Sequence, residues 1–445
     1  MLDLSPAREA EFRRMRETAR EIFGSALKNA SIESAFARNI HCERRVLRVG
    51  EDLYDLDSYH RVFVVSIGKA AHTMAAALEA RAGSNFEGIV ASPGEGQGQV
   101  RGFRYFCGGH PMPTDESIRA AEAILKSLCA LDSQSLALFM VSGGGSAVVE
   151  KPVDDEISLS DLVATYRALV HSGATIAEIN TIRKHISAVK GGRLAQAAYP
   201  AQQVSILVSD VPDSTPDALA SGPTMPDSTS IADCYRLAEK YALIEQFPKS
   251  VADLFRQKAL DETPKSDDPA FVRARWWTVL SNKVAIDEAA AAASRAGFAV
   301  EIDNSCDDWP YDKAAIYLLG RLRELRSKVS RVCLISGGEV TVKVRNGGVG
   351  GRNQQFALAC AEQIAGDNIT VLSAGTDGID GNSLAAGAMV DGSTVARLNT
   401  HSDGVAVRRA LATFNASPLF ATLGDAIITG PTGNNLRDLR IMLAY

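Results

Sequence analysis

The 445-residue sequence lacks any apolar run near the roughly 18 residues that a membrane-spanning helix needs. Its first residues, MLDLSPAREAEFRRMRETAREIF, are charged throughout and lack the apolar segment of a secretory signal peptide. Neither sign of charge dominates, because 47 lysines and arginines stand against 53 aspartates and glutamates, a net charge of −6. We therefore expect no membrane span, no signal peptide, and no binding to nucleic acid or to an anionic membrane.

Disulfide and metal patterns are also missing. The seven cysteines are scattered without a CxxC pair, and several lie inside apolar runs such as VCLIS and ALACA. The seven histidines form no HExxH or other ligand spacing. An odd, dispersed set of cysteines predicts reduced thiols in a cytoplasmic protein, not a disulfide framework or a zinc site.

What the sequence does contain is a recurring boundary between apolar runs and small polar residues. Five short apolar runs end at a serine that glycine or aspartate follows closely: VFVVSIG, ALFMVSGGGS, SILVSDV, RVCLISGG and TVLSAG. Such runs are typical of strands buried on both faces, as in parallel sheets. Helical segments alternate with them, which predicts an α/β fold with helices on both faces of the sheet. The expected helices span residues 69–83, 115–131, 159–172, 176–199, 287–296, 310–327 and 352–365.

A domain boundary is predicted near residues 261–272, where DETPKSDDPAF is polar, contains two prolines and lacks periodicity. The stretch WWTVLSN after it, with the helix and strand that follow, indicates the opening βαβ unit of another domain. We therefore expect two α/β domains, a larger one over residues 1–265 and a smaller one over residues 266–445.

The strand ends are the expected ligand sites, because open α/β sheets bind ligands at the carboxyl ends of their strands. After the first run, Ser66 and Gly68 lead to Lys69 at a helix start. Lysine is an unusual choice there, since a helix N-terminus already carries partial positive charge. Lys69 is therefore either a solvated lysine or a cation directed at a phosphate beside the helix N-terminus.

Three consecutive glycines follow another run, in the segment Ser142, Gly143, Gly144, Gly145 and Ser146. Glycines cost conformational entropy when they are ordered, so packing alone explains them poorly. Backbone N–H groups without Cβ atoms can close around phosphate or carboxylate oxygens. The alternative is a crowded strand–helix turn. The spacing fits neither the GxGxxG dinucleotide fingerprint nor the GxxxxGK[ST] phosphate loop.

A basic segment, IRKHISAVKGGR, contains Arg183 and Lys190 seven positions apart. On one continuous helix these two residues share a face. We interpret the segment as a positive wall for an anionic substrate, with a solvated basic face as the alternative.

Three carboxylates are candidate ligands of Mg²⁺, which prefers oxygen. Asp210 ends an apolar run, where an unpaired carboxylate is costly to bury. Glu339 follows Gly337 and Gly338, and Asp377 lies in the turn TDGIDG, whose two carboxylates, Asp377 and Asp380, could contact a cation or a ribose. The alternatives are Asx turns, helix caps and ordinary turns.

The loop GGVGGRNQQ, from Gly347 to Gln355, is the most specific stretch. Four glycines surround Val349, and Gly351 leads to Arg352 and Asn353 at a helix start. Arginine can hold two phosphate oxygens at once, and a floppy hairpin is the alternative. Glycine turns, the two cations Lys69 and Arg352 and the carboxylates together favour phosphoryl transfer, which depends on positioning and charge neutralisation.

Nine segments between about residues 8 and 442 closely resemble the glycerate 2-kinase family, the MOFRL-type glycerate kinases: SIGKAA, GGHPMPTDES, VSGGGSA, IRKHISAVKGGRLA, LVSDVPDSTPDALASGPT, ISGGEVTV, GGRNQQFAL, SAGTDGIDGNSLAAGA and GPTGNNLRDLRI. The resemblance implies a Rossmann-like N-terminal domain, a MOFRL-type C-terminal domain, and an active site in the cleft between them. It implies an ATP- and Mg²⁺-dependent kinase for the 2-hydroxyl of D-glycerate, with Lys69 and Arg352 catalytic. Gln355 stands where an acidic residue is more common in the family, and Asn434 stands where threonine is common.

On this basis we expect D-glycerate against the Gly143–Ser146 turn and the basic segment, and the ATP phosphates near Gly337, Gly338 and Arg352. Mg²⁺ is expected on some of Asp210, Glu339 and Asp377. The full set of predicted binding residues is Ser66, Gly68, Ser142, Gly143, Gly144, Gly145, Ser146, Arg183, Lys190, Gly337, Gly338, Gly351 and Asn353.

Two other functions remain open at this point. A hydroxypyruvate reductase using NAD(P)H, a label carried by relatives of the family, lacks support because no dinucleotide fingerprint is present. A non-catalytic sugar-phosphate sensor would not turn over ATP. In each case the expected partner is a small molecule, and the chain is expected to be a monomer or homodimer.

Overall fold

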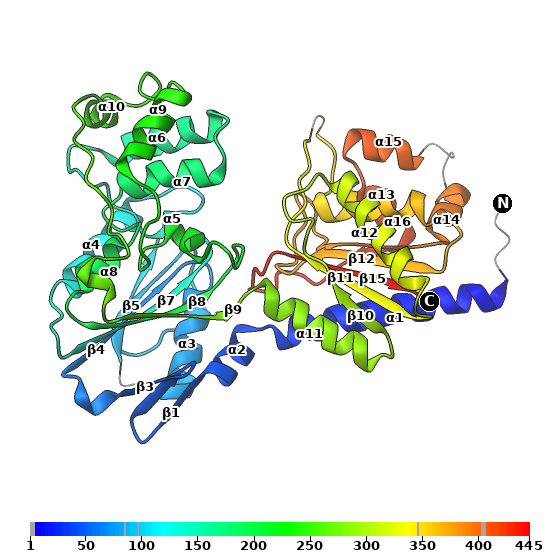
Figure 1. Cartoon of the computed structure of the whole chain (residues 1–445), viewed down its shortest axis with the longest axis horizontal. Coiled ribbons are helices and arrows are strands. Elements are labelled where there is room, and N and C mark those ends of the chain that lie inside the picture. Colours follow the sequence, from blue (N-terminus) through cyan, green and yellow to red (C-terminus); the bar gives the residue numbers. More distant parts are fainter. Residues whose placement is uncertain (1–4, 84–85, 97, 345–346, 402–405) are drawn as a thin grey trace. The chain divides into compact units, whose positions relative to one another are not determined.

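The computed structural model describes residues 5–83, 86–96, 98–344, 347–401 and 406–445 (Figure 1). The chain divides into two compact units: unit 1 combines Met1–Ser31 with Leu280–Tyr445, and unit 2 is Ile32–Val279. None of the helices in the described stretches has both the length and the apolar character needed to cross a bilayer.

Unit 2 is built on a six-stranded sheet. Its strands are β4 (Arg61–Ile67), β5 (Glu87–Ser92), β6 (Phe103–Cys107), β7 (Ser135–Ser142), β8 (Gln202–Val208) and β9 (Ala274–Leu280). They lie in the order β6-β5-β4-β7-β8-β9, and the pairs from β6 to β8 are parallel. Every residue of β7 is buried, as its unbroken apolar sequence predicts. The prediction of an α/β fold is thereby confirmed for this unit.

Unit 2 also contains helices. They are α2 (Ile32–Asn39), α3 (Ala71–Ala82), α4 (Asp115–Leu128), α5 (Gly145–Val148), α6 (Leu159–His171), α7 (Ile176–His185), α8 (Arg193–Ala198), α9 (Ile231–Lys240) and α10 (Lys249–Arg256). Helices α6, α7, α9 and α10 share an apolar core of their own, which includes Leu162, Tyr166 and Phe255. A small antiparallel sheet of β1 (Ile40–Glu43), β2 (Val46–Val49) and β3 (Asp52–Asp55) completes the unit.

The prediction of one continuous helix over residues 176–199 is wrong, because the structure has two helices there. Helix α7 ends at His185 and α8 begins at Arg193. Gly191 and Gly192 lie between them with φ values of +55° and +87°, a left-handed backbone that ends a helix and favours glycine. Arg183 and Lys190 therefore do not share a helical face.

Unit 1 holds a mixed six-stranded sheet. Its strands are β10 (Ala299–Ile302), β11 (Val332–Gly337), β12 (Ile369–Gly375), β13 (Gly387–Asp391), β14 (Ala426–Ile427) and β15 (Asp438–Ala444), in the order β10-β11-β15-β12-β13-β14. Strand β15 is antiparallel to both β11 and β12, so these two strands point the same way on either side of it. The expectation of parallel pairing holds here for β10 and β11, whereas the other pairs are antiparallel.

The helices of unit 1 are α1 (Pro6–Asn29), α11 (Asn282–Arg295), α12 (Tyr311–Arg326), α13 (Arg352–Gln363), α14 (Thr394–His401), α15 (Ala406–Thr413) and α16 (Ser417–Leu423). Helix α1 runs beside α11 and buries Met15, Ile22 and Phe23 in the same core as Ile286 and Ile441 (Figure 1). This packing assigns the first helix to the unit formed by the end of the chain.

The observed division differs from the expected boundary between residues 265 and 266. The stretch WWTVLSN does not open unit 1, because most of it belongs to β9, which lies beside β8 in the sheet of unit 2. The expected boundary also placed α1 with unit 2. A contiguous cut cannot represent a helix that packs on residues more than 250 positions later.

Candidate active site

In unit 2 the order of the strands reverses between β4 and β7. The chain passes from β4 outward to β5 and β6 and then returns to β7 on the other side of β4. In open α/β sheets, ligands bind outside the carboxyl ends of the strands at this point of reversal. The two turns that begin there are the Lys69 turn after β4 and the triple-glycine turn after β7.

Hydrogen bonds lock these two turns together. The Lys69 N–H donates to the Gly143 carbonyl at 2.8 Å, and the Ala70 N–H donates to Ser142 Oγ at 3.0 Å. Gly68 has φ +110°, and a Cβ there would lie 2.4 Å from the Ser142 carbonyl oxygen. Only glycine allows this approach.

Ser66 and Ser142 serve the turns themselves. The Ser66 hydroxyl donates to the Ala71 carbonyl at 2.8 Å, and the Ser142 hydroxyl donates to the Ile67 carbonyl at 3.1 Å. Both side chains are buried. The predicted contacts of these two serines with substrate stay predictions, but in the described structure their hydroxyls have partners within the protein.

Lys69 itself is exposed, and its side chain passes over Gly144. Gly144 has φ +81°, and a Cβ there would lie 3.0 Å from Lys69 Cγ and 3.5 Å from His110 Cε1. Partial burial, and then the charge of Lys69, lower the pKa of His110. The absence of a Cβ on Gly144 thus lets the stem of Lys69 lie close over the turn.

Asp210, just after β8, reaches the same turn. A Cβ on Gly143 would lie 1.9 Å from Asp210 Oδ2, so the carboxylate occupies the space that any other residue type would fill. On the far side of the turn, Ser146 Oγ is hydrogen-bonded to Ser221 Oγ at 2.9 Å. The structure therefore gathers Lys69, Gly143–Ser146 and Asp210, three of the predicted features, at the carboxyl ends of neighbouring strands.

The basic segment is organised around a buried glutamate that the sequence reasoning missed. Glu150 forms an ion pair with Lys190 and accepts hydrogen bonds from the hydroxyls of Tyr166 and, at 2.6 Å, Ser187. Lys190 is only 1% exposed, and burial lowers its pKa against the opposing effect of Glu150. Arg183 stacks on the Tyr166 ring with its Cζ 4.4 Å from the centroid. We therefore expect Arg183, not Lys190, to present charge to a ligand.

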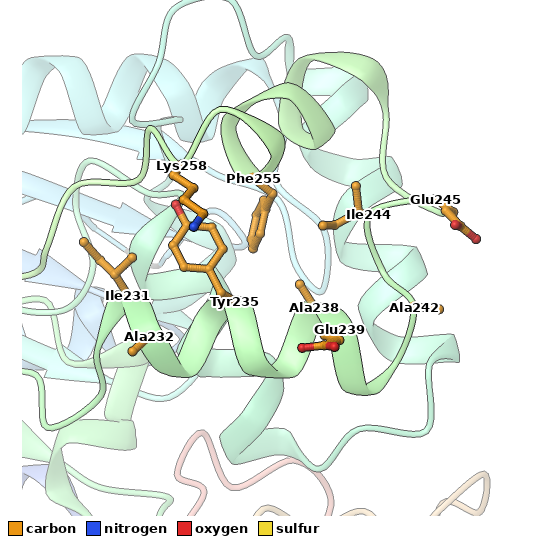
Figure 2. Close-up of a pocket in the computed structure, with 10 residues that line it drawn as sticks. All are labelled: Ile231, Ala232, Tyr235, Ala238, Glu239, Ala242, Ile244, Glu245, Phe255 and Lys258. Atoms are coloured by element: carbon orange, nitrogen blue, oxygen red, sulfur yellow. The ribbon is translucent and has the colours of Figure 1, made fainter.

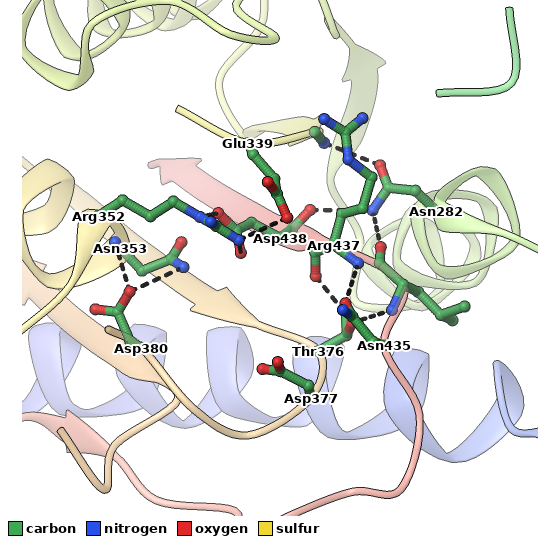
Figure 3. Close-up of polar contacts among 12 residues, drawn as sticks. Asn282, Glu339, Arg352, Asn353, Thr376, Asp377, Asp380, Asn435, Arg437 and Asp438 are labelled. Carbon is green, nitrogen blue, oxygen red and sulfur yellow. Dashed lines mark hydrogen bonds and ion pairs between the residues drawn. The ribbon is translucent and has the colours of Figure 1, made fainter. Parts of the chain in front are cut away.

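In unit 1 a second polar cluster forms where β11, β12 and β15 meet. Because β15 is antiparallel to its two neighbours, its first residue, Asp438, lies between their carboxyl ends. Arg352, at the start of α13, holds Asp438 with a fork: Nε donates to Oδ2 at 2.6 Å and Nη2 to Oδ1 at 3.0 Å. Nη2 also donates to Glu339 Oε1 at 2.7 Å (Figure 3). Burial raises the pKa of Glu339 and the charge of Arg352 lowers it, and the net result is a raised pKa.

The N-terminus of α13 is already occupied by a carboxylate. Asp380 accepts from the N–H group of Asn353 at 3.0 Å (Figure 3). It also accepts from the N–H group of Gln354 at 2.9 Å. Gly351 must be glycine because a Cβ would lie 2.3 Å from Asp380 Oδ1. The Asn353 side chain is buried and accepts from the Ser373 hydroxyl at 2.6 Å. The predicted ligand contacts of Gly351 and Asn353 stay predictions, although both positions have structural partners.

The Gly337–Gly338 turn is likewise bonded within the protein. The N–H groups of Gly337, Gly338 and Glu339 donate to Asn304 Oδ1, Asn282 Oδ1 and Asp307 Oδ1 at 2.8, 2.9 and 2.9 Å. The guanidinium of Arg440 donates to the carbonyls of Gly337 and Gly338 at 3.2 and 3.3 Å. Phosphate binding by these amides stays a prediction.

Asp377 makes the Asx turn that was its alternative interpretation, because Oδ1 accepts from the Ile379 N–H at 3.1 Å. Within the described ranges, no three histidine, cysteine or acidic side chains are grouped as a metal cage. That Asp210, Glu339 and Asp377 are ligands of Mg²⁺ stays a prediction.

Comparison with known proteins adds the family. Residues 332–438 match the model of the MOFRL family, and residues 18–256 match a model described as a domain of unknown function, DUF4147. A D-glycerate 2-kinase from Thermotoga maritima is 36% identical over 86% of this chain and 90% of its own length. A glycerate 2-kinase from Pyrococcus horikoshii is 32% identical, with 96% and 97% covered. The chain belongs to the family of MOFRL-type glycerate kinases.

Members of this family also share the fold. A crystal structure of glycerate kinase from Thermotoga maritima superposes with a TM-score of 0.84 at 32% identity, covering 97% of this chain and all of that one. The reductase name occurs as well, since a putative hydroxypyruvate reductase from Agrobacterium vitis is 34% identical over 96% of this chain and 94% of its own length.

Three residues of these clusters were not singled out from the sequence: His110, Glu150 and Asp438. Asp438 had the clearest signal, because a carboxylate between Arg437 and Arg440 begins an otherwise apolar run. Asp380 was singled out with Asp377 in the turn TDGIDG, but its place at the start of α13 was not predicted.

A further cavity of about 770 Å³ lies along α9 and α10 (Figure 2). Ile231, Tyr235, Ile244 and Phe255 form much of its wall, with Lys258 and two glutamates among the lining residues. It contains none of the glycine turns, so it does not enter the argument for phosphoryl transfer.

Proposed function

We propose that the protein transfers the γ-phosphoryl group of ATP to the 2-hydroxyl of D-glycerate and releases 2-phospho-D-glycerate and ADP. The observation that carries the proposal is the exposed Lys69 above Gly144, at the point where the strand order reverses between β4 and β7. Relatives named glycerate kinases cover most of the chain and support the choice of acceptor.

In this proposal Lys69 neutralises charge on the transferring phosphoryl group, and the Gly143–Ser146 turn with Arg183 receives the glycerate carboxylate. The 2-hydroxyl oxygen attacks the γ-phosphorus, the bond to the β,γ-bridging oxygen breaks, and the hydroxyl proton passes to water. A loose transition state needs no strong base. Asp210 is proposed to serve as a carboxylate ligand of Mg²⁺ beside the turn.

Arg352 is proposed as the second catalytic cation. Its guanidinium is already aimed by Asp438 and Glu339, while its side chain remains 37% exposed. Glu339 and Asp438 place negative charge beside Arg352, although Arg440 also pairs with Asp438 at 3.7 Å. Mg²⁺ bound with ATP would offset the repulsion between these carboxylates and the phosphates. The expected location of the active site, in a cleft between two domains, stays a prediction.

The reductase alternative is compatible with the strand order of unit 2 but not with the sequence of its first βα turn. The strand order of unit 2 is that of dinucleotide-binding folds, yet topology alone does not define function. The first βα turn reads SIGKAA. It has an exposed lysine where the dinucleotide fingerprint has glycines that let the backbone come close to the pyrophosphate. We therefore retain the kinase.

Location and partners follow from the same proposal. All seven cysteines are free thiols, which supports a reducing, cytoplasmic environment. The partners are small molecules, and the oligomeric state, monomer or homodimer, stays a prediction.

The test is coupled detection of ADP with D-glycerate as acceptor, followed by phosphorus NMR of the product. A 2-phosphate signal is the expected result, and a 3-phosphate or no ADP release contradicts the proposal. In parallel, loss of NADH absorbance with hydroxypyruvate would support the reductase instead.

A further inference from the structure

Unit 1 contains a cavity of about 550 Å³ next to Arg352. The apolar walls of this cavity are Val340, Val342, Val344 and Phe414. Another part of it is lined by Gly347, Gly348, Gly350 and Gly351. Arg352 and Glu339 also line it. The volume lies in the range of roughly 300–1,000 Å³ that is typical of small-molecule sites.

The glycine loop is held in place as a wall of this cavity. Asn382 accepts from the Gly350 N–H at 2.9 Å and donates to the Gly348 carbonyl at 3.0 Å. The Val349 N–H donates to Asn415 Oδ1 at 2.9 Å. Gly348 approaches Phe414 so closely that a Cβ would lie 2.3 Å from its carbonyl oxygen. Side-chain hydrogen bonds thus shape the loop before any ligand arrives.

One amide completes the lining. Gln355 Nε2 donates to the Leu411 carbonyl at 3.2 Å, which fixes the orientation of the amide because a carbonyl can only accept. The Gln355 Oε1 is buried and has no partner within the described ranges. The cavity therefore combines valine and phenylalanine walls with the polar side chains of Asp308, Glu339, Thr341, Arg352, Gln355 and Asn382.

We infer that this cavity binds the nucleoside of ATP, an inference that rests on the proposed function. A flat, largely apolar base fits the valine and phenylalanine walls, which a small anion such as glycerate would not fill. When the nucleoside part of ATP is bound there, the phosphates attached to it come within reach of the Arg352 guanidinium. The glycines then serve mainly to form the wall of a base site, and Arg352 receives the phosphates.

The test fills the cavity with a larger side chain. Val342→Trp is expected to raise the KM for ATP by about tenfold or more and to leave the KM for D-glycerate within about twofold. Val349→Trp is the matched control, because Val349 belongs to the same loop and is 42% exposed but does not line the cavity. Val344→Trp, at a position that is 65% exposed, repeats the test where misfolding is least expected.

Two probes separate the nucleoside from the phosphates. Adenosine should inhibit the wild-type enzyme in competition with ATP and should lose most of its binding in Val342→Trp, measured by calorimetry. Tripolyphosphate binding should be unchanged in the same variant. Equal adenosine binding and equal KM for ATP in the wild type and both cavity variants would overturn the inference while leaving kinase activity intact. Adenosine binding that depends on Val342, without any ADP release from glycerate and ATP, would instead overturn the proposed function and keep the site.

Discussion

At the scale of single residues, Lys69 and Arg352 are held in opposite ways. Lys69 is exposed and rests on a glycine, whereas Arg352 is gripped by two carboxylates. The lysine is a flexible point charge, and the arginine is a planar fork with a fixed direction. Lys69 can therefore adapt its position to a ligand, whereas the direction of Arg352 is already set.

Replacing Lys69 with methionine should therefore remove charge and little else. We expect Lys69→Met to lower kcat by at least about 100-fold, or about 2.7 kcal/mol of transition-state stabilisation, with an unchanged melting temperature. Lys126→Met, at another exposed lysine, is the control and should retain full activity. A Lys69→Met enzyme with wild-type kcat would remove this residue from the mechanism.

Arg352→Lys keeps the charge but loses the fork. Lysine cannot hold both oxygens of Asp438 and also Glu339, so the cation should lose its direction. We expect kcat to fall by at least about 100-fold, while the KM for D-glycerate changes much less. Arg323→Lys, at a largely exposed arginine of the same unit, serves as the control. Retention of more than about a third of wild-type kcat would show that diffuse positive charge is enough.

Asp380 gives a pH-dependent signature. Burial, opposed by the amides of Asn353 and Gln354, raises its pKa from the ordinary 3.8 to about 6. Between these values the unfolded state loses its proton first, so this residue's contribution to the free energy of unfolding falls as pH rises. It is constant below 3.8 and above about 6.

Asp380→Asn removes this titration and retains an acceptor for the helix. Relative to the wild type, the variant should therefore gain stability as pH rises from 4 to 6, by no more than about 1.4 kcal/mol per pH unit. Urea denaturation of both proteins across this range measures the difference. A difference that does not vary with pH would show that Asp380 is ionised throughout.

At the scale of elements, the turns at the strand ends need glycine where neighbouring atoms occupy the position that a Cβ would take. Gly143 is an example, because the Asp210 carboxylate occupies its missing Cβ position. Gly143→Ala should destabilise the fold by about 1–3 kcal/mol and lower kcat, because either the turn or Asp210 must move. Gly320→Ala is the control: it lies inside α12 with open space around it and should add about 0.5–1 kcal/mol of stability.

A second variant identifies the cause. The double substitution Gly143→Ala with Asp210→Ala removes the clash and should recover most of the lost stability, measured by denaturation, but not the activity. Failure to recover stability would mean that the backbone, and not the carboxylate, sets the requirement for glycine.

Elements with strong local signals could be predicted from the sequence. The apolar runs that end in serine became β4, β7, β8, β11 and β12, and α4, α6, α12 and α13 lie within one to three residues of the expected bounds. The break between α7 and α8 was missed because Gly191 and Gly192 were read as part of a helix. Asp438 was missed because strand register, which pairs it with Gly375, depends on contacts distant in sequence.

At the scale of the whole molecule, helix α1 belongs to unit 1, the unit that also contains the last residues of the chain. Arg16 of α1 secures it: the side chain is 9% exposed and pairs with Asp391 at 2.7 Å and with Asp425. Removing one partner of such a pair leaves buried carboxylates uncompensated. Arg397 still pairs with Asp425, which limits the loss.

Arg16→Met should therefore destabilise unit 1 by about 3 kcal/mol. Hydrogen exchange should show weaker protection in α1, β12 and β13, while β4 and β7 of unit 2 keep theirs. Arg236→Met, which removes an exposed pair with Asp233 in unit 2, should cost less than about 1 kcal/mol. Equal loss of protection in both units would contradict the assignment of α1 to unit 1.

The position of β15 has a consequence for synthesis on the ribosome. This strand lies between β11 and β12, which do not pair with each other and so cannot join until residues 438–444 have been made. All of Ile32–Val279 precedes them, so unit 2 can complete its sheet while unit 1 is still without its central strand. Helix α1 precedes all of these segments, so its apolar face, with Met15, Ile22 and Phe23, lacks its partners until the residues of unit 1 that pack on it have been made. Apolar surface exposed during that interval favours aggregation.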